Sequence, residues 1–105
     1  MMTSALAPLV GRYVTVADVV HDYIQLRFDN GDILNIFNEY GLEGIGGFDV
    51  QALVGRRVAS VSVQPQEVRV QLDGVQLRVS LLDAAFRGPE AIEYIPASGC
   101  PVVWS

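Results

Sequence analysis

Few residues of this sequence could carry out chemistry, and the best placed are one histidine and one cysteine. His21 is followed by Asp22, and a His–Asp pair can form half of a catalytic arrangement. Their position between two apolar segments is better explained by a surface turn. Cys100 lies between Gly99 and Pro101. It would need a basic partner or a helix N-terminus to be reactive, so we expect an inert, partly buried thiol.

Carboxylates and glycines offer two further chemical interpretations. Asp29 and Asp32 could serve as acid and base or bind a cation, but their spacing is typical of a hairpin turn, and the dense aspartates of a calcium loop are absent from the sequence. The glycines between residues 41 and 47 suggest a phosphate loop, which needs a following helix and a nearby Lys or Arg. Here acids surround the glycines and the sequence contains no lysine. We therefore expect that the protein is not an enzyme and that it has no catalytic, metal or cofactor site.

Acidic residues are concentrated in the first half of the chain. Residues 1–52 contain seven acids and two arginines, whereas residues 53–105 contain five of each, so the first half accounts for the net charge of −5. Such a field repels nucleic acid and attracts a basic protein partner. The acids that we assign to partner binding are Asp18, Asp22, Asp32, Glu39, Glu43 and Asp49. The competing explanation is that these acids only keep the protein in solution.

The elements that must position these acids form an internal repeat. Leu9-Val10-Gly11-Arg12 recurs 44 residues later as Leu53-Val54-Gly55-Arg56, and with one gap at Asn30 residues 9–36 align with residues 53–79. Between the identities, apolar residues lie opposite apolar ones. A pattern repeated in this way predicts two copies of one supersecondary unit, neither of which can bury its apolar face alone.

Each copy is predicted to be a three-stranded antiparallel meander. The expected strands are residues 12–20, 23–28 and 33–37 in the first copy and residues 56–63, 67–72 and 75–82 in the second. Clean alternation in residues 23–28 places Ile24, Leu26 and Phe28 inside. Imperfect alternation in residues 12–20 predicts burial on both faces or a bulge. Asp29-Asn30-Gly31-Asp32 and Asp73-Gly74 predict the hairpin turns.

Length and composition predict one all-β domain, since 105 residues, half of them apolar and 18% charged, suffice for a core. We divide it into repeat one (9–38), a Gly-rich connector (39–52), repeat two (53–82) and a C-terminal hairpin (83–105), after a loosely packed lead-in over residues 1–8. The connector is expected to be a loop with one helical turn at residues 50–53, capped by Asp49. The hairpin is a candidate lid, anchored by Trp104. A barrel-like closure and two stacked sheets both remain open.

The cysteine content and the apolar segments of the sequence favour a location in the cytoplasm. One cysteine cannot form an internal disulfide, which favours a reducing compartment. No apolar run approaches the roughly 18 residues that span a membrane. Ala5-Leu6-Ala7 resembles a signal-cleavage site, but it lacks a positive flank and its apolar part is too short. We expect a cytoplasmic protein that does not cross a membrane.

A resemblance to a known class of proteins follows from the second half of the chain. Four segments carry the resemblance. They are Leu53-Val54-Gly55-Arg56, the alternating hairpin around Asp73-Gly74, residues 86–91 (Phe-Arg-Gly-Pro-Glu-Ala) and the terminal Val102-Val103-Trp104. The chain resembles small, uncharacterised bacterial β-rich proteins, some of which are immunity proteins of contact-dependent and polymorphic toxin systems. The resemblance covers residues 53–105 and extends to the first copy by repetition. It implies a cognate binding role, and acidic immunity proteins cover basic active sites of nuclease toxins.

These observations predict a non-catalytic protein-binding module, and most concretely an immunity protein that neutralises a basic toxin domain. Two alternatives stay open. One is a small-ligand-binding β-barrel or accessory domain with its pocket under the connector. The other is a structural homodimer subunit, because the edges of open meanders must be paired or covered.

Overall fold

The computed structural model describes residues 6–44, 50–86 and 88–104, which form strands joined by turns and short 3₁₀ helices. The strands of the first half are β1 (Val14–Val20), β2 (Tyr23–Phe28), β3 (Ile33–Ile36) and β4 (Tyr40–Glu43). Those of the second half are β5 (Val58–Val63), β6 (Glu67–Leu72), β7 (Val75–Ser80), β8 (Ile92–Ile95) and β9 (Val102–Trp104). The 3₁₀ helices are η1 (Ala7–Leu9), η2 (Val50–Leu53) and η3 (Asp83–Ala85). The predicted all-β class is confirmed.

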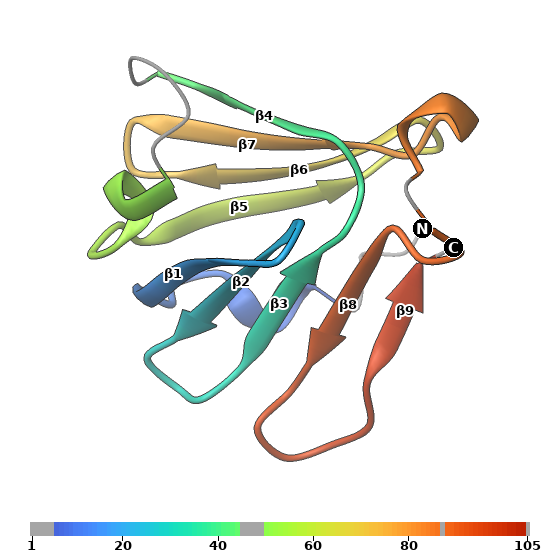
Figure 1. The fold of residues 1–105 in the computed structure, drawn as a ribbon. Helices are drawn as coiled ribbons and strands as arrows, with labels where there is room; N and C mark the ends of the chain where they lie inside the picture. The colour runs from blue at the N-terminus through green and yellow to red at the C-terminus, as the bar shows by residue number, and fades with distance from the viewer. Residues whose placement is uncertain (1–5, 45–49, 87, 105) are drawn as a thin grey trace.

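Two antiparallel sheets form two layers, and the strands of one run across those of the other (Figure 1). The larger sheet has the strand order β1-β2-β3-β8-β9, and the smaller sheet has the order β4-β7-β6-β5. An isolated bridge between Tyr13 and Arg57 joins them at one corner. The sheets do not close into a barrel, so the stacked arrangement is the correct one of the two that the sequence left open.

The apolar residues predicted to lie inside fill the space between the sheets. Leu26, Phe28, Val70 and Leu72 are each at most 3% exposed. They come from β2 and β6, and they belong to one cluster that contains residues of both sheets. Burial of one such side chain contributes roughly 1.5–3 kcal/mol, so this shared core holds the two copies together.

The backbone of the two copies repeats in detail. Strand β1 has a bulge between Val14 and Val16, and β5 has one between Val58 and Ser60, again 44 residues apart. A bulge in the first strand was one of the two outcomes predicted from its imperfect alternation. The extra residue turns the following side chains to the other face, which explains why the alternation fails at the same place in both copies.

The repeated glycines join the two copies to each other. The Gly11 amide donates to the Val58 carbonyl and the Gly55 amide donates to the Val14 carbonyl, both at 2.8 Å. Each copy thus donates the same hydrogen bond to the other copy, so an approximate twofold axis relates the two copies. Gly11 and Gly55 have φ values of +90° and +87°, which residues with a side chain rarely adopt. The Leu-Val-Gly-Arg segment therefore recurs because its glycine is required in this contact.

Each copy has a fourth strand, which it exchanges with the other copy. Strand β4 follows the first copy but pairs with β7, and β8 follows the second copy but pairs with β3. The two registers are equivalent, since Gly41 lies opposite Arg78 and Glu93 lies opposite Asn35. Asn35 and Arg78 are matching positions of the repeat. The first and second copies therefore hold each other through swapped last strands as well as through the core.

The prediction that residues 39–52 form a loop with one helical turn is partly wrong. Residues 40–43 form β4, whose glycine at position 41 had favoured a loop. Pairing with β7 stabilises this strand, and local preference does not reveal such a partner. The helical turn at residues 50–53 is confirmed as η2. Its predicted cap, Asp49, lies outside the described residues.

Two predictions about the ends of the chain are also wrong. Leu6 and Leu9 are fully buried, so the lead-in is part of the core from residue 6, where η1 takes the place that η2 has in the second copy. The C-terminal hairpin is not a lid, because β8 and β9 lie side by side with β3 and extend the larger sheet (Figure 1). The side chain of Trp104, its predicted anchor, lies outside what the structure describes.

Candidate protein-binding face

The larger sheet has one face that points away from the core, because strand alternation turns every second side chain outward. We call this surface the outer face of the larger sheet. Its side chains are those of Val16, Asp18, Val20, Tyr23, Gln25, Arg27, Ile33, Asn35, Phe37, Glu93, Ile95 and Val103. The face therefore combines apolar, aromatic and charged groups on a continuous sheet.

A polar row crosses the centre of this face. Asp18, Gln25, Asn35 and Glu93 are successive cross-strand neighbours. The Gln25 amide donates to Asn35 Oδ1 at 3.1 Å, and the Asn35 amide donates to Glu93 Oε1 at 3.2 Å. Asn35 is only 6% exposed, so these bonds satisfy groups whose desolvation alone would cost about 1–3 kcal/mol. The row fixes its own side chains and ends in a carboxylate on each side.

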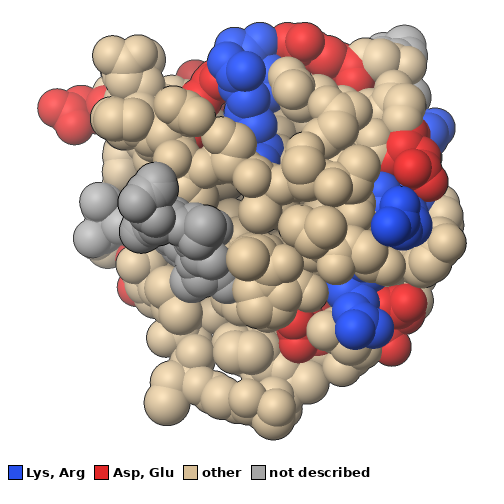
Figure 2. Space-filling model, turned by 180° about the vertical axis from the view of Figure 1, so that it is seen from behind, with Lys and Arg blue, Asp and Glu red and all other residues tan. Residues whose placement is uncertain are grey.

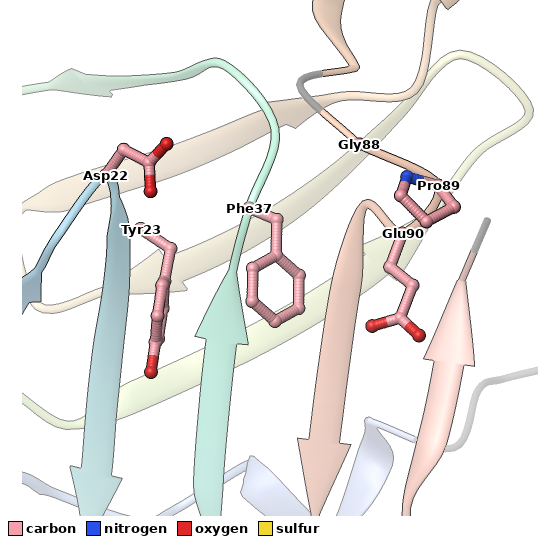
Figure 3. Close-up of a pocket in the computed structure, with 6 residues that line it drawn as sticks. All are labelled: Asp22, Tyr23, Phe37, Gly88, Pro89 and Glu90. Carbon is pink, nitrogen blue, oxygen red and sulfur yellow. The ribbon is translucent and has the colours of Figure 1, made fainter.

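A pocket of about 180 Å³ opens beside the polar row (Figure 3). The residues that line it are Asp22, Tyr23, Phe37, Gly88, Pro89 and Glu90. The rings of Tyr23 and Phe37 have their centroids 5.1 Å apart and are tilted by 51°. In Figure 3 Asp22, which directly precedes β2, lies above Tyr23, and Glu90, beside β8, lies on the other side of Phe37. The pocket thus has an aromatic centre and acidic sides.

The smaller sheet has an outer face of another character. Its side chains are those of Ser60, Ser62, Glu67, Arg69, Gln71, Gln76, Arg78 and Ser80. The charges are paired, since Glu67 binds Arg69 and also Arg78 at 3.2 Å. The hydrogen bond from Arg69, supported by Arg78, holds the pKa of Glu67 below its ordinary value. Seen from behind, the molecule shows arginines beside acidic side chains and no broad patch of one sign (Figure 2).

The repeat allows the two outer faces to be compared position by position. The matching pairs, larger sheet first, are Val16 and Ser60, Val20 and Gln64, Tyr23 and Glu67, Ile33 and Gln76, and Phe37 and Ser80. Because both copies build the same strands, folding does not require apolar side chains at these outward positions. Single apolar residues are common on protein surfaces, whereas neighbouring ones that form a patch point to contact with another molecule.

The acids assigned to partner binding do not form one cluster. Asp18 and Asp22 are exposed on the outer face of the larger sheet and at its edge. Glu39 and Glu43 lie instead in a hollow of the smaller sheet, where Arg78 pairs with Glu43. Asp49 lies outside the described residues.

Asp32 is 4% exposed and belongs to a buried hydrogen-bond network. Its carboxylate accepts bonds from the Tyr94 hydroxyl at 2.5 Å and from the Ala97 amide at 2.8 Å. Burial alone would raise the pKa of Asp32, but these bonds, with Asn30 and Arg12, hold the pKa below its ordinary value of 3.8. Burial, together with the bond to Asp32, raises the pKa of Tyr94, so the hydroxyl stays a donor. Asp32 therefore serves the fold, and we leave it out of the binding surface.

The histidine and the cysteine occupy turns. His21 is exposed with a φ of +56° between β1 and β2, which confirms the predicted turn. Cys100 is exposed in the turn of the β8–β9 hairpin, so the expectation of a partly buried thiol is wrong. In that hairpin β8 is the counterpart of β4, whereas the turn and β9 have no counterpart among the described residues of the first copy. In residues 6–44, 50–86 and 88–104, no three potential metal ligands cluster, and no helix is long and apolar enough to cross a membrane.

Sequence reasoning missed Glu90 and Glu93, which join Asp18 and Asp22 on this side of the larger sheet. They belong to the half of the chain in which acids and arginines balance. Only the pairing of β8 with β3 brings them there. No local pattern reveals that exchange, although the position of both fourth strands directly after their copies is consistent with it.

Comparisons with known protein families, curated proteins and solved structures gave no match for this chain.

Proposed function

We propose that this chain is a non-catalytic protein-binding module that binds a basic protein through the outer face of the larger sheet. The observation that carries the proposal is the difference between the matching outward positions of the two copies. Protein interfaces use a few large aromatic anchors surrounded by polar groups. Tyr23 and Phe37 have this character, and their counterparts Glu67 and Ser80 do not.

Charge supports a basic partner. Four carboxylates lie on or beside this face, those of Asp18, Asp22, Glu90 and Glu93. Among the paired strand residues of the face, one arginine, Arg27, carries the opposite charge. The whole chain carries a net charge of −5. A field of one sign accelerates association with a partner of the other sign and disfavours partners of the same sign.

Within this class we propose the role of an immunity protein that neutralises a basic toxin domain. The resemblance of residues 53–105 to toxin-immunity proteins suggests it. Neutralisation by contact needs a stable, charged and partly apolar surface but no reactive group, which agrees with a face built on a sheet.

The experiment is affinity purification from the native host with three forms of the chain. The test variant, Val20→Gln with Phe37→Ser, carries the residues of the second copy at the matching positions. The control, Ser62→Ala with Gln76→Ala, changes the outer face of the smaller sheet. We expect the wild type and the control to capture a basic protein and the test variant to lose it. Capture that is equal in all three forms would contradict the proposal.

The immunity role needs a second measurement on the captured protein. Its expression alone should stop the growth of a bacterial host, and coexpression of the wild-type chain should restore growth. Coexpression of the Val20→Gln, Phe37→Ser variant should not. A captured protein that is harmless when expressed would leave the binding module but remove the immunity role.

A further inference from the structure

We infer that the pocket between Tyr23 and Phe37 is a receptor for one arginine side chain presented by the partner. The inference rests on the proposed function and adds the chemical group that is recognised. At about 180 Å³ the pocket is smaller than sites for small molecules, which are usually about 300–1,000 Å³. Its size fits a single side chain that enters from another surface.

The aromatic centre of the pocket suits a planar cation. The negative faces of aromatic rings attract cations, and a guanidinium can also stack on them with its plane. Tyr23 and Phe37 are half-buried, so their rings are held by the sheet while part of each stays accessible. Gly88 and Pro89 form the remaining wall, where the methylene stem of an arginine can pack.

The acidic sides of the pocket suit the donors of the same group. Asp22 and Glu90 are both exposed, Asp22 above Tyr23 and Glu90 beyond Phe37 (Figure 3). A guanidinium has five N–H donors in a fixed fork, which a carboxylate can bind through two parallel bonds. A lysine ammonium lacks both the fork and the stacking plane, so arginine is the better match.

The second copy has a hollow at the matching positions of its outer face. This hollow is larger, about 730 Å³. The residues that line it are Gln64, Pro65, Gln66, Glu67, Arg69, Arg78, Ser80 and Leu82. Both of these arginines bind Glu67. In the second copy, the chain therefore supplies its own guanidinium groups to an acidic hollow on the outer face.

In the first copy the positions of those two arginines hold neutral amides. Gln25 matches Arg69, and Asn35 matches Arg78. The amides bond to each other and to Glu93 across the polar row. The first copy thus keeps carboxylates and adds aromatic rings, while the arginines at the matching positions are absent. The pocket of the first copy therefore differs from the matching hollow in the aromatic rings at its centre.

The test is a nuclear magnetic resonance titration of the full chain with N-acetyl-arginine amide. We expect saturable shifts at the amides of Tyr23, Phe37 and Gly88. N-acetyl-citrulline amide, which has the same shape without the charge, should bind at least roughly tenfold more weakly, as should N-acetyl-lysine amide, which has the charge without the fork.

Two double variants show whether the pocket carboxylates are responsible. Asp22→Asn with Glu90→Gln should weaken binding of the arginine probe at least roughly tenfold. Glu43→Gln with Asp73→Asn makes the same change in net charge on the smaller sheet and should leave binding within about twofold. Circular dichroism checks that all forms are folded.

Equal binding of the arginine and citrulline probes, or shifts away from the pocket, would overturn the inference. Equal binding of arginine and lysine would overturn the choice of guanidinium. These outcomes differ from failure of the proposed function. If the wild type captures a basic protein but does not bind the arginine probe, the protein-binding function is retained and the assignment of the pocket to arginine is rejected. If the probe binds but no protein is captured, the pocket binds free guanidinium compounds and the proposed protein-binding function is rejected.

Discussion

Asp32 belongs to a hairpin turn, where an exposed side chain is expected, but its carboxylate is buried. Tyr94 and Ala97 enclose its carboxylate because β8 returns beside β3. Asp32→Asn keeps the shape but loses charge-assisted bonds, so we expect it to lower the free energy of unfolding by about 1.5–3 kcal/mol in urea. The matched control is Asp29→Asn in the same turn, where the carboxylate is exposed and 4.0 Å from Arg12. It should cost about 0.5 kcal/mol or less, and equal losses would argue against the network.

The same carboxylate predicts a pH dependence. The pKa of Asp32 in the folded chain lies below its ordinary value of 3.8, which applies to the unfolded chain. Its stabilising effect is therefore fully present above about pH 5 and is lost as the pH falls through the folded-state pKa. The difference in unfolding free energy between wild type and Asp32→Asn should be constant at neutral pH and shrink below pH 3.8. A difference that stays unchanged down to about pH 2.5 would contradict this assignment.

Phe28 and Arg69 test the assignment of inside and outside. Phe28 is 3% exposed in the shared core, whereas the Arg69 side chain is 47% exposed on the outer face of the smaller sheet. Phe28→Ala should cost about 3–5 kcal/mol, because it removes a ring from a packed core. Arg69→Ala should change stability by roughly 0.5 kcal/mol or less. Thermal and urea unfolding of both variants measure this, and comparable losses would mean that the faces are exchanged.

At the scale of elements, the exchange of fourth strands can be tested by cross-linking. Gly41 lies opposite Arg78 in the exchanged arrangement, and a Cβ atom added at Gly41 would meet no atom within 4 Å apart from its chain neighbours. In a Cys100→Ser background, Gly41→Cys with Arg78→Cys should form a disulfide under mild oxidation. The closed loop of about 37 residues predicts roughly 3–4 kcal/mol of stabilisation in the chain-entropy model.

The control for this experiment is the arrangement without exchange. If β4 turned back beside β3, Gly41 would lie opposite Asn35. Gly41→Cys with Asn35→Cys should therefore stay reduced in the monomer. Formation of this second disulfide, with failure of the first, would contradict the exchanged strands.

The sequence predicts elements far better than it predicts their pairing. Alternation and turn glycines located the meander strands, because both signals are local. Strand β4 was missed because its partner β7 lies far along the chain. The candidate site divides in the same way. Asp18 and Asp22 were identified from local charge, whereas the roles of Glu90 and Glu93 depend on the pairing of β8 with β3.

At the scale of the whole molecule, the two copies share a fold but not a surface. The shared core and the exchanged strands need the inward residues of both copies, so those are alike. The outward residues are free to differ. The smaller sheet pairs its charges internally, and the larger sheet gathers rings and carboxylates around a pocket. Under the proposed function, the repeat provides stability and one face of the larger sheet provides binding.

The most direct test of that division is the rate at which the captured basic protein associates with two triple variants. One variant neutralises the binding side through Asp18→Asn, Asp22→Asn and Glu90→Gln. The other makes the same charge change on the smaller sheet through Glu43→Gln, Glu67→Gln and Asp73→Asn. Stopped-flow measurements follow both over a range of salt concentrations.

We predict that the first variant associates at least roughly tenfold more slowly than wild type at low salt, and the second much less so. The difference should shrink as the screening length falls from about 30 Å at 0.01 M salt to about 3 Å at 1 M. Equal slowing of the two variants would mean that only net charge matters, and it would contradict a binding surface on the outer face of the larger sheet.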